Sequence, residues 1–145
     1  MGCYLLHMRT LLAVTFLASL AACPLTNSSG GECQLDKDCS GSELCARDEM
    51  CAPASTIREV TATWTIRGAA ADVTTCASHP DLYIQFIGND SGDTLGFAPV
   101  PCKVGQFIVD KLPDRFRQVE LGVEGGVSDT RTINAAGMAA LDLRL

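Results

Sequence analysis

From residue 58 onward the chain alternates between apolar and polar side chains, the pattern of β-strands with one buried face. The alternation falls into seven short segments separated by Gly, Pro and Asp turns, the sixth covering residues 128–133 and the last residues 138–145. The apolar positions expected to point inward are Val60, Ala62, Trp64, Ile66, Leu82, Ile84, Phe86, Leu95, Phe97, Phe107, Val109, Val119, Leu121, Val123, Leu141, Leu143 and Leu145. This pattern predicts an all-β fold, a single antiparallel β-sandwich of about seven strands over residues 58–145.

The N-terminal pattern is different. An apolar run over residues 10–22 follows a short, weakly positive start and ends in Leu20-Ala21-Ala22-Cys23. A charged start, an apolar middle and small residues before the cut form a secretory signal, predicted over residues 1–22. The run is too short to span a bilayer, which needs about 20 apolar residues. A plain signal peptide with a cysteine there by chance is the alternative.

The order apolar, small, small, Cys resembles the lipobox of bacterial lipoproteins. The resemblance implies that the chain is cut before Cys23, that the thiol receives a diacylglycerol, and that the new amine receives a fatty acyl chain such as palmitate. Cys23 is therefore the predicted lipidation site and the lipid bilayer the first predicted partner. Pro24 is not the Asp that marks inner-membrane retention in this family. The expected location is the cell envelope, at the outer membrane rather than the inner, with the ectodomain periplasmic or surface-exposed.

Charge restricts the remaining partners. The 145-residue chain carries a formal net charge of -6, and loss of Arg9 with the signal changes this to about -7. An acidic chain with singly scattered Lys and Arg disfavours a nucleic-acid partner. Residues 23–31, which are rich in Ser and Gly after the cysteine, are expected to be a flexible tether.

Four cysteines repeat at six-residue intervals within residues 32–53: Cys33, Cys39, Cys45 and Cys51. This segment is too short and too polar to bury a core, so disulfides are the expected support, with three pairings open. Zinc is the alternative, but structural zinc ligands are usually spaced two to four residues apart. No metal or cofactor is expected. The run Cys33-Gln-Leu-Asp-Lys-Asp-Cys39-Ser-Gly-Ser-Glu-Leu-Cys45 resembles the small Dickkopf-like or EGF-like modules of secreted proteins.

Cys76 and Cys102 frame the second and third predicted strands, and the chain is expected to be exported, so a Cys76–Cys102 bridge is predicted. Farther on, Gly105-Gln-Phe107, Leu112-Pro113 and Phe116-Arg-Gln-Val119-Glu-Leu121 resemble transthyretin-like or carboxypeptidase-regulatory sandwiches. That family resemblance implies an accessory or adhesive role. An immunoglobulin-like or fibronectin-like sandwich stays open as an alternative.

Catalytic chemistry has little support in the sequence. His79 is the one histidine after the signal, and its neighbours Ser78 and Asp81 are too close in sequence to form a typical catalytic set. Trp64 is expected in the core. We therefore predict a non-enzymatic binding or structural module with an envelope or extracellular protein partner. The alternatives are an inhibitor that blocks a protease with its stapled loops, and a small envelope enzyme.

Overall fold

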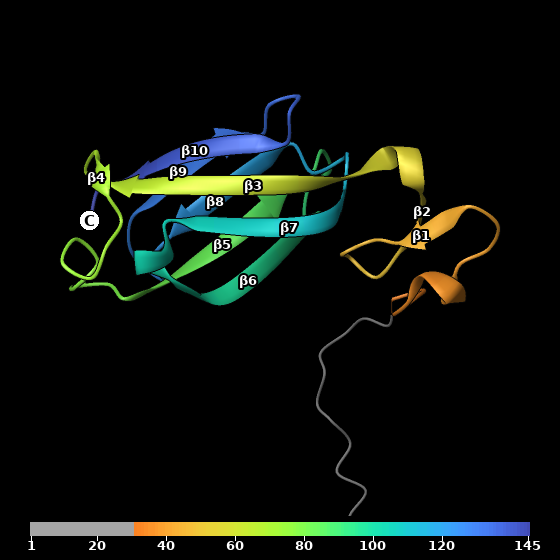
Figure 1. Cartoon of the computed structure of the whole chain (residues 1–145), viewed down its shortest axis with the longest axis horizontal. Helices are drawn as coiled ribbons and strands as arrows, with labels where there is room; N and C mark the ends of the chain where they lie inside the picture. The colour runs from red at the N-terminus through yellow and green to blue at the C-terminus, as the bar shows by residue number, and fades with distance from the viewer. Residues whose placement is uncertain (1–30) are drawn as a thin grey trace, which may run out of the picture.

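The computed structural model describes residues 31–145, and it confirms the all-β class. A small disulfide module leads into a two-sheet sandwich (Figure 1). The module holds the 3-10 turn η1 (Asp36–Asp38) and the hairpin β1 (Glu43–Cys45) and β2 (Cys51–Pro53). Residues 31–145 contain no helix long and apolar enough to cross a membrane.

The first sheet is built around the longest strand, β3 (Ile57–Ile66). It pairs with β7 (Gln106–Pro113) on one side, with β10 (Met138–Leu143) on the other, and with the two-residue strand β4 (Ala69–Ala70) at its end. The second sheet has the order β6 (Thr94–Pro101), β5 (Asp81–Ile87), β8 (Gln118–Gly122) and β9 (Ser128–Thr132). The seven predicted strands correspond to β3 and β5–β10, and β4 was not foreseen.

One strand pair departs from the expected antiparallel arrangement. β10 runs parallel to β3, with Met138 opposite Thr61 and Leu143 opposite Ile66. The reason is the crossover: β9 lies at the edge of the second sheet, and the chain turns back at residues 133–137 to reach the free side of β3 in the first sheet. Gly137 serves this turn with a φ of 74°, and a Cβ there would lie 2.4 Å from the carbonyl oxygen of Glu59.

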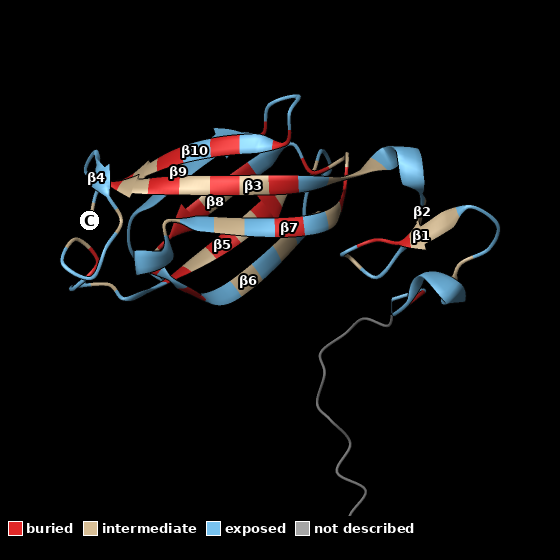
Figure 2. Cartoon of the chain, in the orientation of Figure 1, coloured by how far each residue is buried: buried red, intermediate tan, exposed pale blue. Residues whose placement is uncertain are grey.

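The core lies between the two sheets. Alternate residues of β3 and β5 are buried while their neighbours are not, and β8 follows the same pattern until Leu121 and Gly122, which are both buried (Figure 2). Of the side chains predicted to point inward, twelve are buried: Val60, Ala62, Trp64, Ile66, Leu82, Ile84, Phe86, Val109, Val119, Leu121, Leu141 and Leu143. Five pack against this core with partial exposure: Leu95, Phe97, Phe107, Val123 and Leu145.

Two local features lie outside the alternating pattern. Ala54–Thr56 form the exposed 3-10 turn η2, and β3 begins directly after it at Ile57. Phe116 lies in the turn before β8 and is 1 % exposed. The position of Phe116 is therefore set by the core in which it packs rather than by the local alternation.

Candidate functional site

Cys23 and most of the tether lie outside the described residues. The first described part of the predicted ectodomain is the four-cysteine module, whose pairing the sequence left open. Cys33 bonds to Cys45 and Cys39 to Cys51, so the two bridges cross. The sulfur atoms of Cys33, Cys39 and Cys51 lie within 4.8 Å of one another, but each is already in a disulfide and offers no thiolate to a metal in this form.

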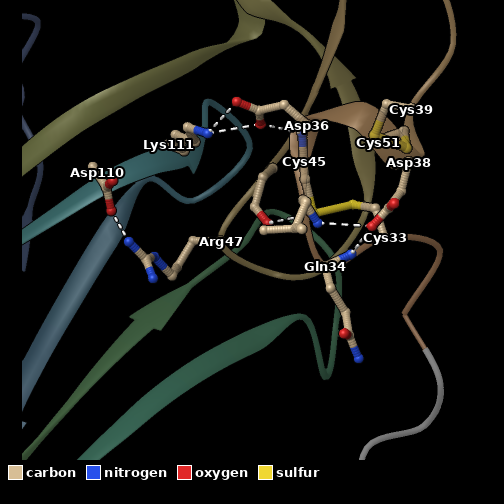
Figure 3. Close-up of polar contacts among 12 residues, drawn as sticks. Cys33, Gln34, Asp36, Asp38, Cys39, Cys45, Arg47, Cys51, Asp110 and Lys111 are labelled. Carbon is tan, nitrogen blue, oxygen red and sulfur yellow. Dashed lines mark hydrogen bonds and ion pairs between the residues drawn. A yellow bond between two sulfur atoms is a disulfide. The ribbon is translucent and has the colours of Figure 1, made fainter.

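The acidic side chains of the module mainly serve its own backbone. Asp38 Oδ2 accepts the N–H groups of Gln34 and Leu35 at 3.1 and 2.9 Å. Asp36 Oδ1 accepts the N–H of Cys45 at 3.0 Å (Figure 3). These hydrogen bonds stabilise a segment that has too few apolar residues to form a core. Each one satisfies a backbone donor where there is little regular structure.

The module is docked on the sandwich through a bulge in β7. The register with β3 moves from Arg58 opposite Leu112 to Val60 opposite Val109, so Asp110 and Lys111 together face one β3 residue. Lys111 has a φ of 52°, and its Nζ donates to both carboxylate oxygens of Asp36 at 2.7 and 2.8 Å (Figure 3). That charged hydrogen bond lowers the pKa of Asp36 below its ordinary value.

The turn between β1 and β2 makes the other docking contacts. The backbone N–H of Arg47 donates to the carbonyl of Lys111 at 3.0 Å, and the guanidinium of Arg47 pairs with Asp110. Arg115 pairs with Asp48 of this turn and, at 2.8 Å, with Asp93 of the β5–β6 turn. Burial opposes the charge of Arg115, but these two carboxylates outweigh it and raise its pKa. The turn at residues 46–50 is therefore held against the sandwich and does not project from it.

The opposite end of the sandwich, which we call the distal end, consists of residues 67–80, the 3-10 turn η3 (Cys102–Val104) and residues 144–145 (Figure 1). A disulfide joins Cys76 to Cys102 there. The N–H of Cys102 donates to the carbonyl of Pro80, and the indole N–H of Trp64 donates to the carbonyl of Cys102, both at 2.8 Å. Trp64 is 4 % exposed, so this bond ties the distal end to the core.

Three shallow, open depressions lie at the distal end, and the loop of residues 71–80 contributes to two of them. One, of about 390 Å³, is lined by Ile66, Arg67, Thr75, Ser78 and His79 among others. A second, of about 510 Å³, is lined mainly by Val73, Ala77, Pro80, Pro101, Asp81 and Lys103. The third, of about 350 Å³, is lined by Arg67, Gly68, Asp142 and Arg144. Together they are the concave surface that the described residues offer to a ligand or partner at the end away from the module.

The structure divides the possible catalytic set considered from the sequence, Ser78, His79 and Asp81, between two of these depressions. Ser78 and His79 line the first and Asp81 lines the second. Within residues 31–145 no hydrogen bond joins their side chains. The surface residues Arg67, Val73 and Lys103 were not foreseen. The predicted Cys76–Cys102 pairing was the one sequence signal that could place residues near 73 beside residues near 103.

Comparison with known proteins identifies no relative of this chain: no family model, no curated protein and no solved structure matches it. The resemblances of residues 20–23, of the cysteine module and of the sandwich to known families therefore stay predictions based on short motifs. The chemistry of the distal end has to be argued from its own side chains.

Proposed function

We propose that the protein is a lipid-anchored lipoprotein of the cell envelope that acts as a non-enzymatic binding or structural module. The observation that carries the proposal is the lipobox-like order Leu20-Ala21-Ala22-Cys23, followed by a short polar tether and a stapled ectodomain. Acylation of Cys23 would supply at least two chains, enough for stable attachment because each buried methylene contributes about 0.8 kcal/mol.

The oxidised cysteines support an envelope location. All six cysteines from Cys33 onward are in disulfides. Disulfides persist in oxidising compartments and are rare where thiols are kept reduced. The N-terminal motif and the described residues therefore fit the same interpretation: the chain is exported, and its ectodomain folds with disulfide bonds.

Charge favours attachment by acyl chains rather than by electrostatic docking. Residues 32–53, next to the tether, carry six carboxylates and only two cations. An anionic leaflet would repel such a segment at close range. The proposed arrangement holds the module at the tether and points the distal end away from the anchor. Pro24 after the cysteine favours the outer membrane within this proposal.

The protease-inhibitor alternative is less favoured by the geometry. An inhibitor of this kind would present a rigid, protruding loop from the disulfide-bonded segment, and the turn at residues 46–50 joins the two strands of its hairpin. Arg47 and Asp48 of that turn are engaged by Asp110 and Arg115 of the sandwich. The distal depressions are open to solvent, which favours a binding role for the sandwich end.

The test is the mature N-terminus of the protein expressed in a Gram-negative host. Mass spectrometry should find a chain that begins at Cys23 and carries diacylglycerol and fatty acyl groups, in the membrane fraction. Cys23→Ser should lack these groups and leave that fraction, while Cys3→Ser should behave as wild type. Unprocessed protein with free thiols in the soluble cytoplasmic fraction would overturn the proposal.

A further inference from the structure

Strand β7 lies at the border of the first sheet, and among the described strands it pairs only with β3. The carbonyl of Gly105 accepts the N–H of Trp64, which sets the alternation of hydrogen bonds along this pair. Odd-numbered residues up to Val109 bond to β3, and even-numbered residues face away from it. The N–H and C=O groups of Gln106 and Ile108 therefore lie on a free edge, where no described residue bonds to them.

Other borders of the two sheets are blocked. On β10, the N–H of Asp142 donates to Oδ2 of Asp129 on β9 at 2.9 Å, which ties the two border strands together on that side of the sandwich. On β6, Pro99 and Pro101 have no N–H to offer, and Gly96 weakens the strand between them and the turn. Side chains that cap the edge and prolines are devices by which natural sheets prevent the addition of a further strand.

The free edge of β7, residues 106–109, has no such device. Its sequence Gln-Phe-Ile-Val contains no charge and no proline, and three of its four residues are strong strand formers. Ile108 is 53 % exposed on the outer face of the sheet. On the inner face, the ring of Phe107 lies 5.1 Å from that of Phe97 on β6, and both rings are only partly buried at the margin of the core. An added strand would therefore cover apolar surface with both rows of its side chains.

The module limits this edge at its far end. The backbone N–H of Arg47 donates to the carbonyl of Lys111 at 3.0 Å, so the module itself occupies the edge beyond the bulge. Antiparallel pairing of two copies about Ile108 would bring each docked module beside η3 of the other copy. A single extended segment has no such body to accommodate, and it fits the free edge better than a second copy of the chain.

We infer that the free edge of β7 is a strand-addition site for an extended segment of another envelope protein that carries aliphatic or aromatic side chains at alternate positions. The segment would bond to the backbone groups of Gln106 and Ile108 and lay its apolar side chains over Phe107. In this mode of recognition, main-chain hydrogen bonds give affinity and alternate side chains give specificity. The inference names the partner of the binding module and in that respect rests on the proposed function, but its backbone argument does not depend on the acyl anchor.

The probe is a synthetic peptide that alternates valine with threonine and ends in one lysine and one glutamate, mixed with the isotope-labelled full chain in detergent micelles. On binding, the amides of Gln106 and Ile108 should become protected from hydrogen exchange. The amides of Phe107 and Val109 should change little, because they already bond to β3. A peptide of the same composition with its valines grouped together should not bind.

Two substitutions on the free edge should weaken the Kd for the alternating peptide at least about tenfold. Ile108→Pro removes an N–H that β3 does not use, so the first sheet should keep its pairing. Ile108→Lys places a charge on the edge, which disfavours strand addition. Met138→Lys is the matched control and should bind like wild type. Met138 is 51 % exposed and lies in the same row of the outer face, since both it and Ile108 are opposite Thr61, but it is on β10.

Equal weakening by Met138→Lys, equal binding of the grouped peptide, or no binding of the alternating peptide would overturn the inference. So would protection that appears only outside residues 106–109, or self-association in sedimentation that Ile108→Lys abolishes while no peptide binds. Peptide binding that persists in Cys23→Ser would uphold this inference even if the lipid anchor proved absent. An acylated Cys23 without peptide binding would overturn this inference alone.

Discussion

At the scale of single residues, Gly122 is tightly packed on the outer face of the second sheet. A Cβ there would lie 2.7 Å from the hydroxyl oxygen of Tyr83 and 2.8 Å from the Cβ of Ser128. The Tyr83 hydroxyl is in turn bonded to Glu120. Gly122→Ala should therefore displace the tyrosine and destabilise the protein by about 1–3 kcal/mol, as overpacking typically does. Urea unfolding followed by Trp64 fluorescence measures this change.

Gly96 on β6 provides the control for that substitution. It lies on the same outer face, and an added Cβ would meet only the carbonyl oxygen of Ile84, at 3.9 Å. Gly96→Ala should be neutral or slightly stabilising, because alanine restricts the unfolded chain. An equal loss of stability in both variants would contradict the packing argument and point to a general cost of replacing strand glycines here.

The burial of single residues could largely be predicted from the sequence, whereas the residues with a left-handed backbone conformation could not. Val60 and Ile84 alternate with polar neighbours, and burial of one sheet face follows directly from that period. Lys111 looks like an ordinary surface lysine in the sequence. Its left-handed conformation exists because β7 gains a residue opposite β3, a property of pairing between distant segments.

At the scale of elements, the Cys76–Cys102 bridge determines how the distal loop is held. The two cysteines are 26 residues apart, and closing a loop of that length stabilises the fold by about 3.5 kcal/mol in the chain-entropy model. The double variant Cys76→Ser and Cys102→Ser should lose roughly that much in urea unfolding. It should also gain protease cleavage within residues 71–80, since the sulfur link to η3 is gone.

Removing the Cys39–Cys51 bridge provides the comparison, because that bridge lies within the module and Trp64 reports on the sandwich. Cys39→Ser with Cys51→Ser should leave the Trp64 transition close to that of wild type. If the two double variants shift this transition equally, the distal bridge has no special role in the sandwich.

The sequence predicted strands better than it predicted their partners. Seven alternating segments were enough to expect a sandwich, since each needed a second sheet to cover its apolar face. The parallel pairing of β10 with β3 depends on where the chain crosses between sheets after β9, and no local pattern records that crossing. Equal six-residue spacing likewise left the module's pairing undecided, because it favours none of the three alternatives.

At the scale of the whole molecule, the module and the sandwich are joined, among the described residues, by three ion pairs and one backbone hydrogen bond. Arg47 and Asp110 pair only with each other among the described residues, with side chains 44 % and 56 % exposed. Arg47→Asp should place like charges together and increase undocking, and adding Asp110→Arg should restore the pair. Exposed pairs contribute about 0.2–1 kcal/mol, and reversing one sign replaces this attraction by a repulsion of similar size, so undocking-dependent exchange should become roughly twofold to thirtyfold faster.

The amide of position 47 is the reporter, because its N–H donates across the interface to Lys111. Its hydrogen exchange should also respond to acid. The pKa of Asp36 is lowered in the folded protein, so the pairing of Asp36 with Lys111 stabilises docking above the ordinary carboxyl value of 3.8 and is lost as pH falls through the lowered value. Protection, corrected for the intrinsic exchange rate, should therefore stay constant between pH 5 and 8 and fall only in stronger acid. Protection that is unchanged in Arg47→Asp, in strong acid and in molar salt would mean that packing rather than charge holds the module in place.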